Sequence, residues 1–146
     1  MPVELITDVA HVIQLAIAPV FLLTGVGSLL GVMTSRLARV IDRGRHIEAT
    51  YATLQPLARG HADEELCVLA HRASLASWAI NFSTAAALVV CGVIGTLFID
   101  AFLGTNLKWL VGALFFAAMI LLICGLVCFL REVYVATHTV YIGPPR

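Results

Sequence analysis

Charged residues are scarce in this sequence. Lys, Arg, Asp and Glu make up 12% of its 146 residues, whereas hydrophobic residues make up 60%. Soluble domains carry roughly 25% charged residues, and a soluble domain of this size could not bury so much apolar surface. The composition therefore excludes an ordinary soluble domain and predicts a single membrane domain over residues 1–146.

The sequence also lacks the motifs by which catalytic and cofactor sites are found. It contains no Gly-rich phosphate loop, no HExxH zinc motif and no Ser/His/Asp arrangement. Its five His and four Cys residues are scattered, without disulfide or metal-ligand spacing. We therefore expect no catalytic, cofactor-binding or metal-binding residues, no cofactor and no enzymatic activity.

Charge is missing altogether from three long apolar runs, at about residues 12–33, 75–98 and 109–130. Each run is long enough to cross a hydrocarbon core, which needs about 20 residues. A segment in the bilayer must satisfy its own backbone polar groups, so each run is expected to be a helix. The predicted fold class is an all-α membrane protein with three transmembrane helices, called here spans one, two and three.

Basic residues are absent before span one and gather after it. The link between spans one and two, residues 34–74, holds six arginines, whereas the link between spans two and three holds only Lys108. Two further arginines follow span three. Because Lys and Arg favour the cytoplasmic side, we expect the long link and the C-terminus in the cytoplasm and the N-terminus outside.

The long link continues the helical pattern of span one. At 100° per residue its apolar side chains form one stripe, made of Leu37, Val40, Ile41, Gly44, Ile47, Tyr51 and Leu54. Pro56 and Gly60 then break the helix, and a second helix restarts with Asp63 as its N-cap. This predicts a cytoplasmic helical hairpin that extends spans one and two. The stripe can pack against the returning helix, against other copies of the chain, or against both.

Three arginines, Arg36, Arg39 and Arg43, lie on one side of this predicted helix, beside the stripe. At the inner end of span one they can contact anionic lipid headgroups or form a dedicated anion or phosphate site. Arg36 or Arg39 can also pair with Glu132, which follows span three. Acidic residues in the same link argue against nucleic-acid binding, so membrane lipids are the expected partners.

Small residues mark span one, where Gly27 and Gly31 have the GxxxG spacing that lets helix backbones approach closely. A three-helix chain offers few internal partners, so we expect homo-oligomerisation through span one and its extension. The predicted helix-packing or oligomer-interface residues are Gly27, Ser28, Gly31, Leu37, Ile41, Ile47 and Tyr51.

Polar residues and proline are rare inside the spans. Gln14 and Asn81 are the intramembrane polar residues of interest. Asn81 is expected to form an interhelical hydrogen bond or to line a polar cavity. Pro19 cannot donate to the carbonyl of Leu15, which predicts a kink in span one.

The stretch "LAIAPVFLLTGVGSLLGVMTSRLARVIDRGRHIE" resembles the signature of an uncharacterised bacterial inner-membrane family, the domain-of-unknown-function family 2721. The resemblance covers about residues 8–135 and is most specific from Ala18 to Arg45. It implies a bacterial source and a cytoplasmic-membrane location. It implies no activity, because the family has none assigned.

Two classes of function remain. The first is a non-catalytic, self-associating membrane scaffold or regulator, which could hold another membrane protein through its hairpin. The alternative is a homo-oligomeric channel in which span one lines the path and an arginine ring surrounds the cytoplasmic mouth. The uncharged spans favour the scaffold, since proton-coupled transport normally needs an ionisable residue in the membrane.

Overall fold

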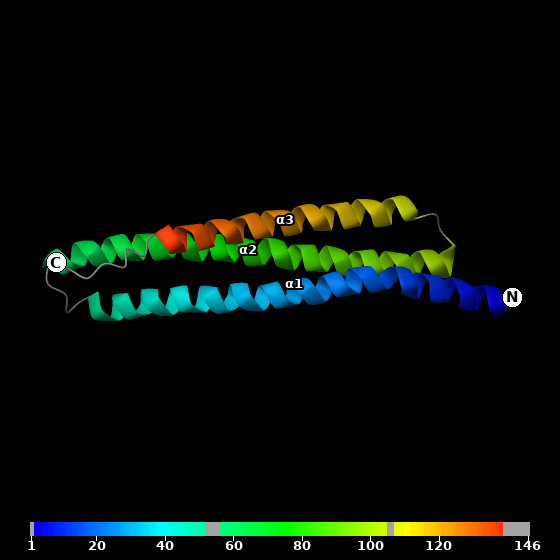
Figure 1. Ribbon diagram of the computed structural model, residues 1–146, viewed down its shortest axis with the longest axis horizontal. Coiled ribbons are helices and arrows are strands. Elements are labelled where there is room, and N and C mark those ends of the chain that lie inside the picture. The colour runs from blue at the N-terminus through cyan, green and yellow to red at the C-terminus, as the bar shows by residue number, and fades with distance from the viewer. Residues whose placement is uncertain (1, 52–55, 105–106, 139–146) are drawn as a thin grey trace. The chain divides into compact units, whose positions relative to one another are not determined.

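The computed structural model describes residues 2–51, 56–104 and 107–138. Three helices make up nearly all of them: α1 (Pro2–Tyr51), α2 (Pro56–Leu103) and α3 (Lys108–His138) (Figure 1). The described residues include no strand. Each helix is long and apolar enough to cross a membrane. The predicted all-α class with three such helices is confirmed.

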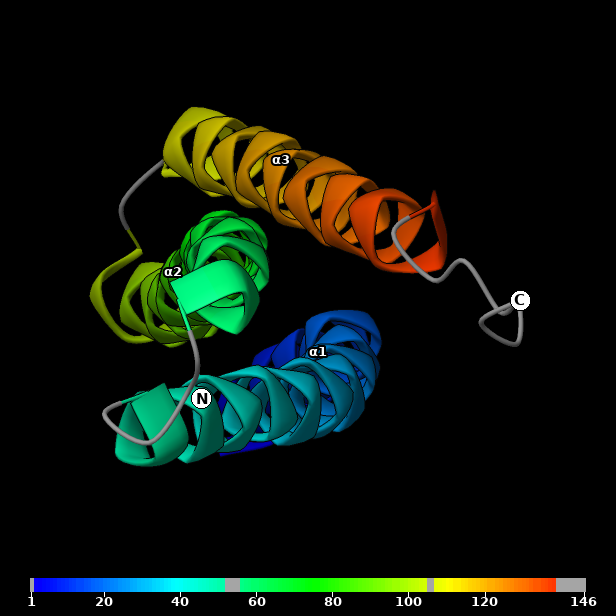
Figure 2. The same cartoon turned by 90° about the vertical axis from the view of Figure 1, so that its left-hand side faces the viewer.

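The contacts within the chain group its residues into two units. Unit 1 comprises Met1–Leu30 and Phe82–Cys124, and unit 2 comprises Gly31–Asn81 and Gly125–Arg146. All three helices contribute to both units, and within each unit their segments lie side by side (Figures 1 and 2). The organisation as a single membrane domain stays a prediction.

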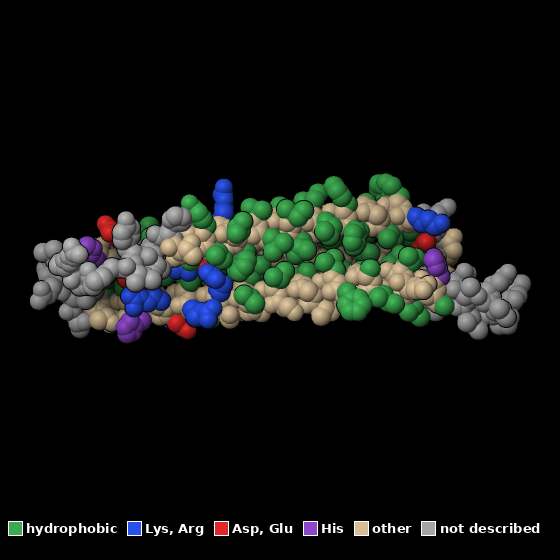
Figure 3. Space-filling model, viewed as in Figure 1, with side chains coloured by type: hydrophobic (Ala, Val, Ile, Leu, Met, Phe, Trp, Pro, Cys, Tyr) green, Lys and Arg blue, Asp and Glu red, His purple; other side chains and the backbone are tan. Residues whose placement is uncertain are grey.

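Unit 1 is apolar both inside and outside. Val26, Ala86 and Leu122, one from each helix, form its buried cluster. Large hydrophobic side chains also cover its visible surface (Figure 3); Phe21 and Phe116, for example, are 73% and 68% exposed. An apolar surface of this extent is unfavourable in water and suits the hydrocarbon of a bilayer. These features indicate a membrane protein.

Unit 2 contains the predicted helical hairpin. α1 continues from span one to Tyr51 without interruption, and the link residues Val40 and Ile47 are buried against Ala62 and Leu69 of α2. Val40, Ile47 and Tyr51 of the apolar stripe therefore pack against the returning helix, whereas Ile41 stays exposed and Leu54 lies outside the described residues.

The helices do separate before Pro56, but the predicted restart of the second helix at Asp63 is wrong. α2 begins at Pro56 and runs through Gly60 and Asp63, so Asp63 is not an N-cap. Proline suits the first turn of a helix, because the N–H it lacks would have no acceptor there. A glycine inside a helix costs only about 1 kcal/mol relative to alanine, and burial of neighbouring Ala62 offsets that cost.

Candidate functional site

A buried carboxylate joins the three helices in unit 2. The Glu132 side chain of α3 is fully buried. Its Oε2 accepts a hydrogen bond from Arg36 Nε of α1 at 3.1 Å. Its Oε1 accepts two from Arg72 of α2, from Nε at 3.3 Å and from Nη2 at 2.9 Å. Of the two pairings that the sequence allowed, Arg36 or Arg39 with Glu132, the structure forms the one with Arg36.

This triad, defined as Arg36, Arg72 and Glu132, holds its two arginines in place. A buried carboxylate is costly unless it is paired and hydrogen-bonded, and here both oxygens of Glu132 have a donor. Arg36 also lies over the ring of Phe129, with 5.7 Å from Cζ to the ring centroid, which adds a cation–π attraction. The two guanidinium groups are thus fixed by contacts from α3.

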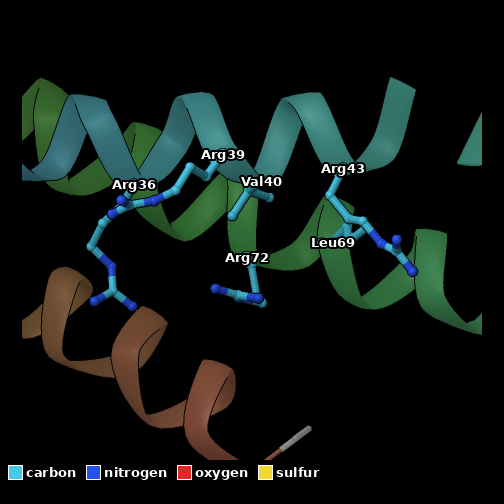
Figure 4. Close-up of a pocket in the computed structure, with 6 residues that line it drawn as sticks. All are labelled: Arg36, Arg39, Val40, Arg43, Leu69 and Arg72. Carbon is cyan, nitrogen blue, oxygen red and sulfur yellow. The ribbon is translucent and has the colours of Figure 1, made fainter. Parts of the chain in front are cut away.

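A pocket of about 290 Å³ lies between α1 and α2 beside this triad. It is lined by Arg36, Arg39, Val40, Arg43, Leu69 and Arg72 (Figure 4). In Figure 4, Arg36 reaches from α1 towards α3, whereas Arg43 extends along α1, away from Arg36 and Arg39. Val40 and Leu69 belong to the buried apolar cluster. The pocket is therefore lined by two buried apolar side chains and by four cationic ones. We call it the arginine pocket.

The remaining two arginines of the pocket differ in their partners. Arg43 Nε donates to Glu65 Oε1 at 2.8 Å, and both side chains are about half exposed. The hydrogen bond and charge of Glu65 raise the pKa of Arg43 above its ordinary value, so Arg43 stays charged. Arg39 is exposed and forms no ion pair with any acidic residue in the described part of the chain. Among the four arginines of the pocket, Arg39 is thus the one without an acidic partner in the described residues.

The structure thus brings Arg36, Arg39 and Arg43 together, as their spacing predicted, and adds Arg72. In the sequence, Arg72 stands out only as one of the six link arginines that predict the orientation. A sequence signal for its role exists, because Arg36, Arg72 and Glu132 each lie within three residues of the end of a predicted span. Groups at the same ends of neighbouring spans share one depth, so their meeting could have been anticipated.

The small-residue face of α1 is not covered by any other part of the chain that the structure describes. Gly27, Ser28 and Gly31 are all exposed, and a Cβ added at either glycine would meet no atom within 4 Å. The opposite side of the helix carries Val26, which is only 2% exposed. The intrachain packing of span one therefore leaves its GxxxG face uncovered.

Some of the other predicted interface residues pack within the chain, and one is exposed. Ile47 is buried and Tyr51 packs on the same cluster, while Leu37 is half-buried. Ile41 is 41% exposed. Within the hairpin, Ile41 is thus the member of the predicted set that remains available to a second molecule.

The intramembrane polar residues and the proline lie as follows. Gln14 and Asn81 are both exposed, and neither side chain bonds to another residue in the described part of the chain. Among the described residues, Asn81 does not form the interhelical hydrogen bond expected for it. Pro19 is buried, and α1 continues through it; the kink stays a prediction.

Comparison with known proteins identifies a family. Residues 16–142 match the family model described as "Protein of unknown function (DUF2721)". Neither the curated proteins nor the solved structures contain a match to this chain. The family model covers most of the sequence and includes the span-one glycines, the arginine pocket and Glu132. The chain therefore belongs to the DUF2721 family, whose function is unknown.

Proposed function

We propose that this protein is a non-catalytic, self-associating scaffold or regulator of the bacterial inner membrane. In this proposal the hairpin and the C-terminus lie in the cytoplasm and the N-terminus lies outside, as the distribution of arginines favours. The non-catalytic role is proposed because the sequence offers no recognisable catalytic motif. The hairpin would also present a surface for another membrane protein.

The observation that carries the proposal is the uncovered small-residue face of α1. In lipid, helices associate by close packing of their backbones rather than by the hydrophobic effect, and glycines permit that approach. Gly27 and Gly31 have open space before them. Ser28 between them donates its hydroxyl to the carbonyl of Thr24 at 3.1 Å, so it adds no unsatisfied donor to the face. A second copy of α1 could pack closely there.

The alternative, a homo-oligomeric channel with span one lining the path, receives less support. The hydroxyls of Thr24 and Ser28 are bonded to carbonyls of their own helix, so they offer little to a passing ion. Arg36, the first arginine after span one, is paired with Glu132 within the chain, which leaves it less available to an arginine ring at a cytoplasmic mouth. We therefore favour the scaffold.

The test is the mass of the particle in nanodiscs of native-like lipid. The wild-type protein is expected to be an oligomer, and replacing Gly27 and Gly31 together by Leu should shift it to smaller species. Leucine side chains would hold the helices apart by several ångströms and remove the close backbone contact.

A matched control uses two glycines elsewhere. Gly92 and Gly95 of α2 are also exposed with open space before them, and the Gly92→Leu/Gly95→Leu variant should keep the wild-type mass. A wild-type protein that is already monomeric in lipid contradicts the proposal, and so does an equal loss of mass in both double variants.

A further inference from the structure

We propose that the arginine pocket is a binding site for a phosphate group, carried by an anionic lipid headgroup or by free phosphate. This inference is independent of self-association. It starts from the charges in and around the pocket. Four guanidinium groups line it, and two carboxylates, Glu132 and Glu65, pair with three of them. Four positive charges against two negative ones leave an excess of two positive charges.

The unused hydrogen-bond donors also favour an oxyanion. A guanidinium group has five N–H donors. Within the described residues, Arg36 and Arg43 each direct only Nε to a carboxylate, so their terminal nitrogens can donate to another acceptor. Arg39 has no acidic partner among the described residues. Phosphate offers several acceptor oxygens, and the planar fork of arginine matches their geometry in pairs.

The pocket is prepared before any ligand arrives. Glu132 has no exposed surface and holds Arg36 and Arg72 from the α3 side. Fixing two like charges near each other in advance removes part of the ordering cost that binding would otherwise carry. At about 290 Å³, the pocket lies at the lower limit of ligand sites, roughly 300–1,000 Å³. It therefore suits a single phosphate group rather than a large ligand.

The depth of the pocket suits a membrane interface. Arg36 and Arg72 each lie within three residues of the end of a predicted span. Trp78 follows Arg72 by about 9 Å along the α2 axis, at 1.5 Å per residue, and is 55% exposed. Exposed Trp residues mark the boundary of the bilayer. A phosphate in the pocket would thus lie near the headgroup level, where anionic headgroups attract arginines by about 1 kcal/mol each.

The experiment measures two probes on the delipidated full-length protein. Inorganic phosphate is titrated calorimetrically into the protein in a neutral detergent. Phosphatidic acid is added to phosphatidylcholine nanodiscs that hold the protein, and native mass spectrometry counts the phosphatidic acid molecules that stay bound to it. Arg39 is the residue to change, because it is exposed and takes no part in the triad. Arg39→Gln should weaken binding of the favoured probe about tenfold or more. Arg39→Lys keeps the positive charge but not the paired donors of the guanidinium group, so it should weaken binding less than Arg39→Gln does.

The control is Arg45→Gln, an exposed arginine of the same helix that does not line the pocket; it should change binding less than twofold. Binding of phosphatidic acid without binding of inorganic phosphate identifies a headgroup as the source. Displacement of phosphatidic acid by inorganic phosphate shows that the phosphate group alone, without a lipid, is enough to occupy the pocket. The proposal is overturned if neither probe responds to Arg39→Gln, or if Arg45→Gln weakens binding equally.

Discussion

Arg72 donates two hydrogen bonds to the same oxygen of Glu132, from Nη2 at 2.9 Å and from Nε at 3.3 Å. Arg36 donates to the other oxygen, so one carboxylate is shared by two arginines from two helices. Glu132 is fully buried, whereas the Arg72 and Arg36 side chains are 20% and 29% exposed. The carboxylate thus depends on the arginines, which can still reach solvent or headgroups.

We expect Glu132→Gln to destabilise the protein more than any single change at an exposed carboxylate. The glutamine keeps the size of the side chain but leaves Arg36 and Arg72 facing each other without a counter-charge. Breaking a buried ion pair by removing one partner costs about 3 kcal/mol or more. The melting temperature in detergent measures the effect, with Glu64→Gln, at an exposed position of α2, as control. Equal melting temperatures for the two variants would contradict the structural role of the triad.

The Arg43–Glu65 pair should contribute much less. Its side chains are 54% and 45% exposed, so solvent screens the attraction, and exposed pairs typically couple by about 0.2–1 kcal/mol. A double-mutant cycle with Arg43→Gln and Glu65→Gln measures the coupling through unfolding in a mild denaturant. We expect a value below about 1 kcal/mol that declines as salt rises. A large coupling that is insensitive to salt would show that the pair is effectively buried.

Tyr51 should ionise at higher pH than an ordinary tyrosine, whose pKa is about 10. Its hydroxyl donates to Asp63 Oδ2 at 3.2 Å, and this bond raises the pKa of Tyr51, against the opposing charge of Arg59. The bond favours the neutral phenol, so its stabilisation is present below about pH 10 and is lost as the pH rises through the raised pKa. Absorbance titration in a background with Tyr134 and Tyr141 changed to Phe measures this pKa. Asp63→Ala should bring it down towards the ordinary value, and an unchanged titration would contradict the contact.

The topology can be tested with single cysteines in a variant that lacks the four native ones. A cysteine at Glu4 should react with a membrane-impermeant reagent added from outside the cell. A cysteine at Arg59 should react only after the membrane is opened, because the six arginines of the link favour the cytoplasm. Labelling of Arg59→Cys in intact cells would reverse the proposed orientation.

Much of the local structure could be predicted from the sequence, since it follows from residue type and spacing. The uncharged runs predicted three long helices, and the spacing of Val40 and Ile47 predicted the face that packs in the hairpin. The start of α2 could not be predicted in the same way. Pro56 serves equally as a helix breaker and as a first-turn residue, and packing of Ala62 and Leu69 against α1 decided between these roles.

The candidate site was likewise predictable only in part. The sequence by itself determined that Arg36, Arg39 and Arg43 share one side of a helix, because 100° per residue fixes that geometry. Only the tertiary structure decided that Arg72 completes the pocket and that Glu132 forms ion pairs with both Arg36 and Arg72. Which opposite charges meet depends on the rotation and register of three separate helices. These are set by packing of apolar side chains throughout unit 2, and no short stretch of sequence encodes them.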